Sequence, residues 1–216
     1  MLEPQLERQT FTVSREFEYF SEAELTTQTG YDREDWWPGV VVKELVDNAL
    51  DACEQAAGSP RIQVDFQGDL LAVADNGPGL PAEVLERVLD FATRTSDKAA
   101  YVSPTRGAQG NALKVIFAIS HVLNGGKAGR VEVESGGVRH TVVVSTDHVL
   151  QRPQIDHRKE EIVKRRGTLV RVTVDSASSK GLEPKVGFLQ NLVQDYSLFN
   201  PHATFELLIH GERTAM

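Results

Sequence analysis

The first residues that could do chemistry interrupt a segment that otherwise has the composition of a buried helix. In "KELVDNALDA", Glu44, Asn48 and Asp51 cut through an apolar face. Their spacing of i, i+4 and i+7 places them on one stripe of a helix, where neighbouring Cβ atoms lie about 5–6 Å apart. Burying an ionised carboxylate without a partner is costly, so this stripe favours a ligand site over a purely structural polar pair.

A second candidate site follows an apolar run typical of a strand. "LLAVADNGPGL" places Asp75 at the end of that run and then turns through Gly77 and Gly79. A carboxylate at a strand end can accept a hydrogen bond from an exocyclic amine such as that of adenine. Glycines let the backbone approach a ligand without a Cβ in the way. Taken alone, however, Asp-Asn-Gly is common turn chemistry, and the turn interpretation is favoured.

A third signal is the glycine-rich stretch "PTRGAQGNALKV". Gly107 and Gly110 come just before an apolar helix, whose free N–H groups could hold phosphates. The two commonest phosphate-binding fingerprints are absent, and glycines before a helix are frequent for capping reasons alone. Residues 93–110 have no periodicity, however, and loops of that length inside compact domains are usually lids or binding elements.

The composition is that of an ordinary globular protein. The chain has 216 residues, 40% of them hydrophobic and 25% charged, which suits one generous domain. A net charge of -8 gives no general sign of nucleic-acid binding. The single cysteine, Cys53, excludes an intramolecular disulfide. Without an apolar run long enough for a bilayer or a signal peptide, we expect a cytoplasmic protein with no membrane partner.

The periodicity predicts an α+β fold. We expect helices at residues 21–30, 39–57 and 82–92, after Asn111, and near Pro184. Strands are expected in "RIQVDF", "LLAVAD", "RVEVE", "VRHTVVV", "TLVRVTV" and "ATFELLI". Adjacent hairpins with helices bunched between them favour a two-layer α/β sandwich, in which a mixed, mostly antiparallel sheet carries helices on one face.

Other conspicuous residues are interpreted as structural. Trp36 and Trp37 are predicted to pack at the entrance of the long helix, and Cys53 to be a small core residue. "HRKEEIVKRR" is interpreted as a solvated hairpin edge whose charge is diluted by Glu160 and Glu161. The histidines show no metal-ligand spacing, so no zinc site is predicted.

In their order along the chain, the three signals resemble the GHKL (Bergerat-fold) ATPase family of gyrase-type topoisomerases, Hsp90 chaperones, MutL repair proteins and histidine kinases. "E-x-x-x-N" on a helix, "D-x-G-x-G" after a strand and the glycine-rich stretch carry the resemblance, and "RRGTLVRV" adds a Gly-Thr pair before a late strand. "KELVDNALDACEQA", "TRGAQGNAL" and "FNPHATFEL" look most like the B-type component of topoisomerase VI. The resemblance covers roughly residues 15–210.

This resemblance implies an ATP site with Mg²⁺. Glu44 would orient and deprotonate the attacking water, and Asn48 would complete the Mg²⁺ shell through its side-chain oxygen. Asp75 would bind the adenine amine, and Thr168 would help to hold that carboxylate. The residues predicted to contact the nucleotide are Asn48, Asp75, Gly77, Gly79, Lys98, Gly107, Ala108, Gln109, Gly110, Asn111 and Thr168.

The sequence also departs from the topoisomerase VI pattern. The stretch Gly107–Asn111 lacks the last glycine of a Gly-Gln-Gln-Gly-Ile-Gly pattern, and Asp97 is inserted before Lys98 in a Thr-Ser-Lys stretch. We expect an N-terminal strap over residues 1–20 and a GHKL domain over residues 21–216 with a lid at about 93–111. The transducer domain, which supplies a lysine to the γ-phosphate in that family, is expected to be absent from this chain.

The resemblance implies an ATPase that acts as a nucleotide-gated dimerisation switch, a homodimer when ATP is bound. DNA would be reached through a topoisomerase A-type catalytic subunit or through domains outside this chain. Two alternatives stay open: a nucleotide-sensing interaction module with negligible turnover, and a MutL-like or Hsp90-like ATPase. A histidine kinase is less well supported, because no helix pair with a phospho-acceptor histidine precedes "KELVDNALDA".

Overall fold

The computed structural model describes residues 16–54, 56, 58–91, 112–150, 152–175 and 185–214, and its strands form a single sheet. The order across the sheet is β5-β4-β3-β6-β2-β1-β7-β8. The strands are β1 (Arg61–Phe66), β2 (Leu70–Asp75), β3 (Gly129–Ser135), β4 (Val138–Asp147), β5 (Arg152–Glu161), β6 (Thr168–Thr173), β7 (Thr204–Ile209) and β8 (Glu212–Arg213).

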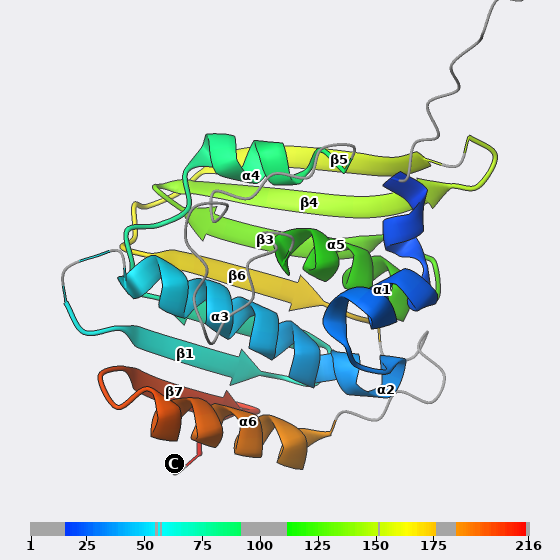
Figure 1. Cartoon of the computed structure of the whole chain (residues 1–216). Helices are drawn as coiled ribbons and strands as arrows, with labels where there is room; N and C mark the ends of the chain where they lie inside the picture. The colour runs from blue at the N-terminus through cyan, green and yellow to red at the C-terminus, as the bar shows by residue number, and fades with distance from the viewer. Residues whose placement is uncertain are drawn as a thin grey trace, which may run out of the picture.

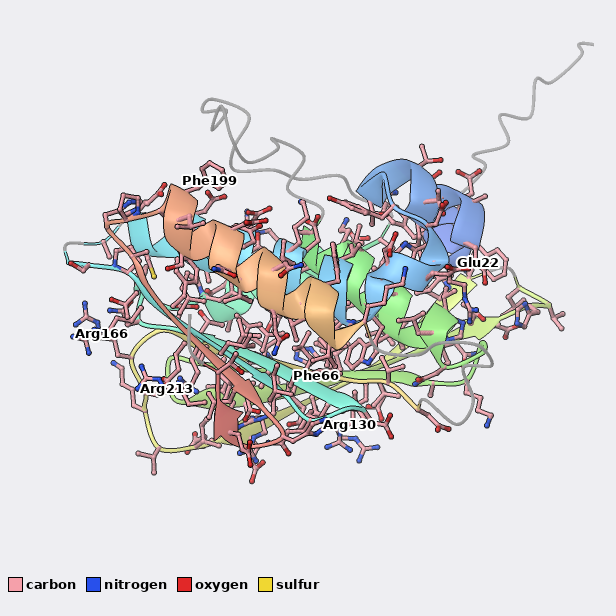
Figure 2. All side chains as sticks on the ribbon, turned by 90° about the horizontal axis from the view of Figure 1, so that it is seen from below. Glu22, Phe66, Arg130, Arg166, Phe199 and Arg213 are labelled. Atoms are coloured by element: carbon pink, nitrogen blue, oxygen red, sulfur yellow. The ribbon has the colours of Figure 1, made fainter. Side chains whose placement is uncertain are left out.

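The helices cover one face of this sheet, and the opposite face carries exposed charged side chains such as Arg130 and Arg213 (Figures 1 and 2). The α-helices are α1 (Glu22–Thr29), α2 (Arg33–Asp35), α3 (Val41–Glu54), α4 (Ala82–Val88), α5 (Ala112–Leu123) and α6 (Val186–Phe199). A 3₁₀ turn, η1 (Glu16–Phe20), and a π-helical turn, η2 (Trp36–Val40), lead into α1 and α3. The predicted two-layer α+β architecture is confirmed.

The sheet is antiparallel except at one pair. β1 and β7 run parallel, with Ile62 opposite Phe205 and Val64 opposite Leu207. The other paired strands, including β2 with β6, run antiparallel. The β2–β6 pairing matters most for the site, because it brings the end of β2, at Asp75, next to the start of β6, at Thr168.

The core lies between the sheet and the helices. Along β1, buried residues alternate with exposed or half-buried ones, as expected for a strand with one face in the core. The buried side of α3 lies over the sheet and leaves the polar stripe at its flank. The buried residues of α3 are Val41, Val42, Leu45, Val46, Ala49, Leu50 and Cys53.

Local predictions at the first helix are confirmed. The Ser21 hydroxyl accepts a hydrogen bond from the Glu24 N–H at 3.2 Å, and Gly30 ends α1 with φ 73°. Trp36 and Trp37 are both buried, as predicted for the helix entrance. Cys53 is buried too.

Some predicted boundaries and strands were wrong. The long helix begins at Val41 rather than at residue 39, because Trp37 has extended backbone angles (φ -114°, ψ 126°) inside η2. The helix predicted over 82–92 ends at Val88. Strands β5 and β8 lie outside the predicted set, because they are mostly polar edge strands without a continuous apolar face.

Gly129 provides a test of how closely α5 packs on the sheet. A Cβ at this position would lie 2.3 Å from the Ser120 hydroxyl and 2.4 Å from the His121 backbone nitrogen. We expect Gly129→Ala to lower the free energy of unfolding by about 1–3 kcal/mol, measured by urea denaturation.

Gly187→Ala in α6 is the matched control, since a Cβ there would meet nothing within 4 Å. This helical substitution should raise the free energy of unfolding by about 0.5–1 kcal/mol. Equal effects of the two substitutions would contradict the close helix–sheet contact at Gly129.

Candidate functional site

Asp75 is the hydrogen-bonding centre of the candidate site. Its Oδ1 accepts a hydrogen bond from the Gly77 N–H at 2.8 Å and from the Thr168 N–H at 3.2 Å. Gly77 lies in the loop after β2, and Thr168 lies at the start of β6, 93 residues from Asp75 in the sequence. Because both backbone bonds end on Oδ1, Oδ2 is left for a side-chain hydroxyl or a ligand donor.

The environment of Asp75 perturbs its ionisation. Burial raises the pKa of the Asp75 carboxyl above its ordinary value. The hydrogen bonds from Gly77 and Thr168 and the charge of Arg165 act in the opposite direction without cancelling this effect. A half-buried carboxylate with one oxygen held by two N–H groups is a strong acceptor with a fixed orientation.

Close backbone packing around Asp75 requires glycine. A Cβ on Gly167 would lie 2.0 Å from the Asp75 carbonyl oxygen, and Gly167 also has a φ of +78°. A Cβ on Gly77 would lie 3.0 Å from Asp75 Oδ1 and 3.4 Å from the backbone of Ala52 in α3. A Cβ on Gly79 would meet the Ser135 hydroxyl at 2.7 Å. These glycines bring the loop, α3 and β6 together around one carboxylate.

Asn76 fixes the loop from its other side. Its Oδ1 accepts a hydrogen bond from the Arg61 N–H at 2.8 Å, and its Nδ2 donates to the Ser59 carbonyl at 3.1 Å. The Cys53 thiol also lies 3.5 Å from Asn76 Oδ1. The loop therefore holds Asp75 in place through contacts with both α3 and β1.

The polar flank of α3 forms a network with α6. Lys43 Nζ lies 3.1 Å from Glu44 Oε1 and 3.2 Å from Asp47 Oδ2, and the Tyr196 hydroxyl donates to Asp47 Oδ1 at 2.7 Å. Burial lowers the pKa of Lys43, but the charges of Glu44 and Asp47 outweigh it and hold that pKa above its ordinary value. The Glu44 side chain is 20% exposed, and its Oε2 has no hydrogen-bond partner among the described residues.

Asn48 carries the clearest sign of an incomplete environment. Its Nδ2 is buried, yet it has no hydrogen-bond partner among the residues that the structure describes. A buried amide without a partner costs roughly 1–3 kcal/mol, so native proteins normally satisfy it. An unpartnered Nδ2 donor fits a ligand that offers an acceptor oxygen beside Asn48, one helical turn from Glu44. The same amide turned over would present its oxygen, which fits a hydrated Mg²⁺ ion.

The structure brings together several of the predicted site residues. Asp75, Gly77 and Thr168 are in direct contact. Glu44 and Asn48 lie on α3, which packs over β1 and β2, and Ala52 of the same helix lies against Gly77. Gly79 lies beside Ser135 of β3. The other predicted residues lie outside the described part of the chain: Lys98, Gly107, Ala108, Gln109, Gly110 and Asn111.

Sequence reasoning missed several residues that shape this site. In the sequence, Gly167 is noticeable only as part of a Gly-Thr pair. In the structure, the absence of a Cβ at Gly167 makes room for the backbone of Asp75. The Lys43–Asp47–Tyr196 network is half visible in the sequence, because Lys43 and Asp47 have i, i+4 spacing on one helix. Tyr196 carries no such signal, because it lies 149 residues from Asp47 in sequence.

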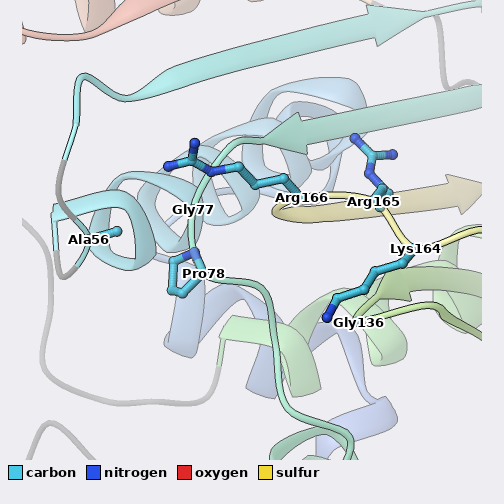
Figure 3. Close-up of a pocket in the computed structure, with 7 residues that line it drawn as sticks. All are labelled: Ala56, Gly77, Pro78, Gly136, Lys164, Arg165 and Arg166. Atoms are coloured by element: carbon cyan, nitrogen blue, oxygen red, sulfur yellow. The ribbon is translucent and has the colours of Figure 1, made fainter.

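A pocket of about 330 Å³ opens on the far side of the Asp75 loop (Figure 3). It is lined by Ala56, Gly77, Pro78, Gly136, Lys164, Arg165 and Arg166. Gly77 is therefore shared between the pocket and the hydrogen-bonded centre at Asp75. Three consecutive cations in the lining give this pocket a positive charge.

Comparison with known proteins identifies the family. The model of the histidine kinase-, DNA gyrase B- and HSP90-like ATPase family matches residues 37–178, which is most of the chain. The chain therefore belongs to this family of ATPases, the GHKL family. Within the described residues, no helix is both long enough and apolar enough to cross a membrane.

Within this family, two curated relatives are similar in sequence to this chain. The B-type component of the type 2 DNA topoisomerase 6 of Natronomonas pharaonis is 31% identical over 173 residues, which cover 76% of this chain and 21% of that protein. The DNA mismatch repair protein MutL of Halalkalibacterium halodurans is 28% identical over 187 residues, which cover 81% of this chain and 27% of that protein. The chain thus spans about a fifth to a quarter of these relatives.

A solved structure supports the fold. The N-terminal domain of a DNA repair protein has a TM-score of 0.51 and 19% sequence identity, with 81% of this chain and 50% of that chain covered. At this identity, the likeness concerns the fold alone.

Gly167→Ala tests the close approach at the site. We expect it to lower the free energy of unfolding by about 2 kcal/mol or more, because the new methyl group overlaps the Asp75 backbone and φ is positive. Gly211→Ala shares the positive φ, at +82°, but has nothing within 4 Å and should cost only about 1 kcal/mol. Chemical denaturation of both variants checks this difference, and equal losses would contradict the contact.

Asp75→Asn tests the buried charge. The folded-state pKa of Asp75 is raised, so the wild-type protein loses stability as the pH rises through that pKa. Asparagine keeps an oxygen acceptor for Gly77 and Thr168 without the charge. We expect Asp75→Asn to have the higher melting temperature at pH 7, and the gap to shrink toward the ordinary aspartate pKa of about 3.9. A gap that is constant with pH would contradict the raised pKa of the Asp75 carboxyl.

Proposed function

We propose that this chain binds ATP with Mg²⁺ and hydrolyses it, and that nucleotide binding gates its dimerisation. Membership of the ATPase family supports the ATPase chemistry. For these particular residues, the proposal rests on Asn48. Its Nδ2 is buried and has no hydrogen-bond partner among the residues that the structure describes, and it lies on the same stripe of α3 as Glu44. Such an arrangement is explained by a polar ligand held against the flank of α3.

Asp75 is assigned to the adenine ring. Its Oδ1 is occupied by two backbone N–H groups, so Oδ2 is the oxygen that can accept a hydrogen bond from the exocyclic amine. Thr168 supports the carboxylate from β6. Gly77 and Gly79 form the loop on the base side, where the missing side chains let α3 and β3 approach.

Glu44 is assigned as the general base. Lys43 holds its Oε1 at 3.1 Å and thereby restricts the carboxylate, while Oε2 faces no protein donor among the described residues. In this role Oε2 orients the attacking water and accepts its proton as the water oxygen bonds to the γ-phosphorus and the bond to the bridging oxygen breaks, which releases ADP. Positioning of this kind supplies a large share of the acceleration in phosphoryl transfer.

Asn48 is assigned to the metal. Its side-chain oxygen would hold Mg²⁺, which, when bound, neutralises the charge that develops on the phosphate oxygens. The oxygen and nitrogen of an amide are assigned from their hydrogen-bond partners, so the Asn48 amide turned over would place its oxygen at the unpartnered Nδ2 position. We propose this orientation for the Mg²⁺-bound state. We assign the phosphate contacts to residues 107–111 and Lys98.

The nucleotide-gated switch is proposed for the assembled protein. We propose residues 1–20 as the strap of a homodimer, 21–216 as the ATPase domain and 93–111 as its lid. Similarity to a B-type component of topoisomerase 6 and to a MutL protein supports action on DNA with a partner subunit. A ligand drives such a switch only by the difference between its affinities for the two states.

A second candidate function is a nucleotide sensor with negligible turnover. The ion pair between Lys43 and Glu44 favours it, because Lys43 competes with water for one oxygen of the proposed base. In that case the same site binds ATP and changes the oligomeric state without hydrolysis at a useful rate.

Glu44→Gln separates these two functions. For an ATPase we expect Mg²⁺-dependent turnover to fall at least roughly 100-fold, while nucleotide affinity changes only a few-fold, because a general base acts in the chemical step. Phosphate release and nucleotide titration measure the two quantities. Glu54→Gln, on the same helix near His202, is the control and should leave both unchanged. Unchanged turnover in Glu44→Gln would favour the sensor and contradict the proposed base.

A further inference from the structure

The pocket beside the Asp75 loop combines a concave shape with a concentration of positive charge. Lys164, Arg165 and Arg166 contribute three consecutive cations to a volume of about 330 Å³. The rest of its described lining is uncharged and small, and no carboxylate lies among it. Figure 3 shows the Arg166 side chain extending across the Gly77 loop and Lys164 pointing toward Gly136. The sign of this charge is opposite to the net charge of the chain, which is -8.

Two of these cations have no counter-ion within the described residues. Neither Lys164 nor Arg166 has a carboxylate within ion-pair distance there. Such groups on a folded surface are solvated unless a ligand replaces the water.

The third cation is only weakly paired. Arg165 Nη1 lies 3.9 Å from Glu134 Oε2. Glu134 is already bound by Arg139 at 2.9 Å and by Arg171 at 2.7 Å. The buried Arg165 Nε has no hydrogen-bond partner among the described residues. Arg139 is also paired with Glu160 at 3.1 Å, and Arg171 also lies 3.8 Å from Glu132. Among the described residues, the unpaired positive charge at the pocket is therefore that of Lys164 and Arg166.

We propose that this pocket is an anion site that takes a multivalent phosphate, next to the adenine end of the proposed ATP site and sharing only Gly77 with it. The inference goes beyond the proposed ATPase function, since nothing in that function uses Lys164 or Arg166. Two sources share the ligand chemistry: a free phosphate compound such as pyrophosphate, and the phosphates of a second nucleotide.

The chemistry of the lining favours a multivalent phosphate over a carboxylate. Arginine presents a planar fork of donors that matches phosphate oxygens, and lysine adds a point charge. Three cations around one small cavity complement a di- or trivalent anion better than a singly charged acetate. A binding pocket of about 300 Å³ or more is large enough for a small ligand.

Duplex DNA fits this pocket less well. Extended phosphate backbones are bound by a stripe of basic side chains, whereas these cations converge on one concavity. The neighbouring end of β5 carries exposed Glu160 and Glu161, which repel a polyanion that runs along this edge. DNA is therefore an outcome that the experiment must exclude.

The test is calorimetric titration of nucleotide-free, Mg²⁺-free protein with pyrophosphate at low ionic strength. We expect binding that weakens with added salt, and at least roughly tenfold weaker binding to the double variant K164Q/R166Q. The double variant K127Q/R152Q removes the same charge elsewhere and should keep the wild-type affinity. Circular dichroism confirms that both variants are folded.

Three further arms make the result decisive. Asn48→Ala, in the proposed ATP site, should retain pyrophosphate binding, so that a failure of the ATPase proposal leaves this result intact. Saturation with a non-hydrolysable ATP analogue should leave pyrophosphate binding in place if a free phosphate is the ligand. If the source is a second nucleotide, a second equivalent of the analogue should bind to the wild-type protein. K164Q/R166Q should not bind this second equivalent, and pyrophosphate should displace it.

Several outcomes would overturn the proposal. If K164Q/R166Q and K127Q/R152Q bind pyrophosphate with equal affinity, the pocket is not the binding site. Loss of pyrophosphate binding in Asn48→Ala, or its displacement by the first equivalent of the analogue, would assign it to the nucleotide site. Duplex DNA binding that depends on Lys164 and Arg166, without pyrophosphate binding, would assign the cations to nucleic acid.

Discussion

The half-buried carboxylate of Asp75 makes the hydrogen bonds on which the arrangement of the site depends. It gathers an N–H group from its own loop and another from the start of β6 on a single oxygen. That convergence is possible only because Gly167 lacks a Cβ, which would otherwise lie 2.0 Å from the Asp75 carbonyl oxygen. Burial raises the pKa of the carboxyl, so the fold maintains an unfavourable charge and gains a fixed acceptor.

The second requirement is a helix that serves both the core and the site. The apolar side of α3 is buried over β1 and β2, and this packing fixes the rotation of the helix about its axis. Glu44 and Asn48 consequently have one orientation relative to the sheet. Asp47 accepts a hydrogen bond from Tyr196 of α6, whereas Asn48 Nδ2 has no hydrogen-bond partner among the described residues.

Helices cover only one face of the sheet, and the other face carries a cluster of charged side chains (Figures 1 and 2). On the open face, arginines from β4, β6 and the loop before β6 converge on Glu134, whose pKa is raised by burial but lowered more strongly by Arg171 and Arg139. Glu160 and Glu132 also pair with Arg139 and Arg171, whereas Lys164 and Arg166 of the loop before β6 have no carboxylate partner among the described residues. This loop leads directly into Gly167 and Thr168, so the cationic pocket and the Asp75 centre are built from adjacent residues.

The sequence by itself determined the features that depend on nearby residues. The Ser21–Glu24 cap, the β1–β2 and β3–β4 hairpins and the single stripe of Glu44 and Asn48 follow from short spacings, and motif order indicated the family. Only the tertiary structure decided the parallel β1–β7 pairing, the edge strand β5, the role of Gly167 and the pocket around Lys164–Arg166. Each of these joins residues distant in the chain or depends on what lies beside a strand edge. Hydrophobic periodicity records only whether a side chain is buried, and it holds no information on which distant segment buries it.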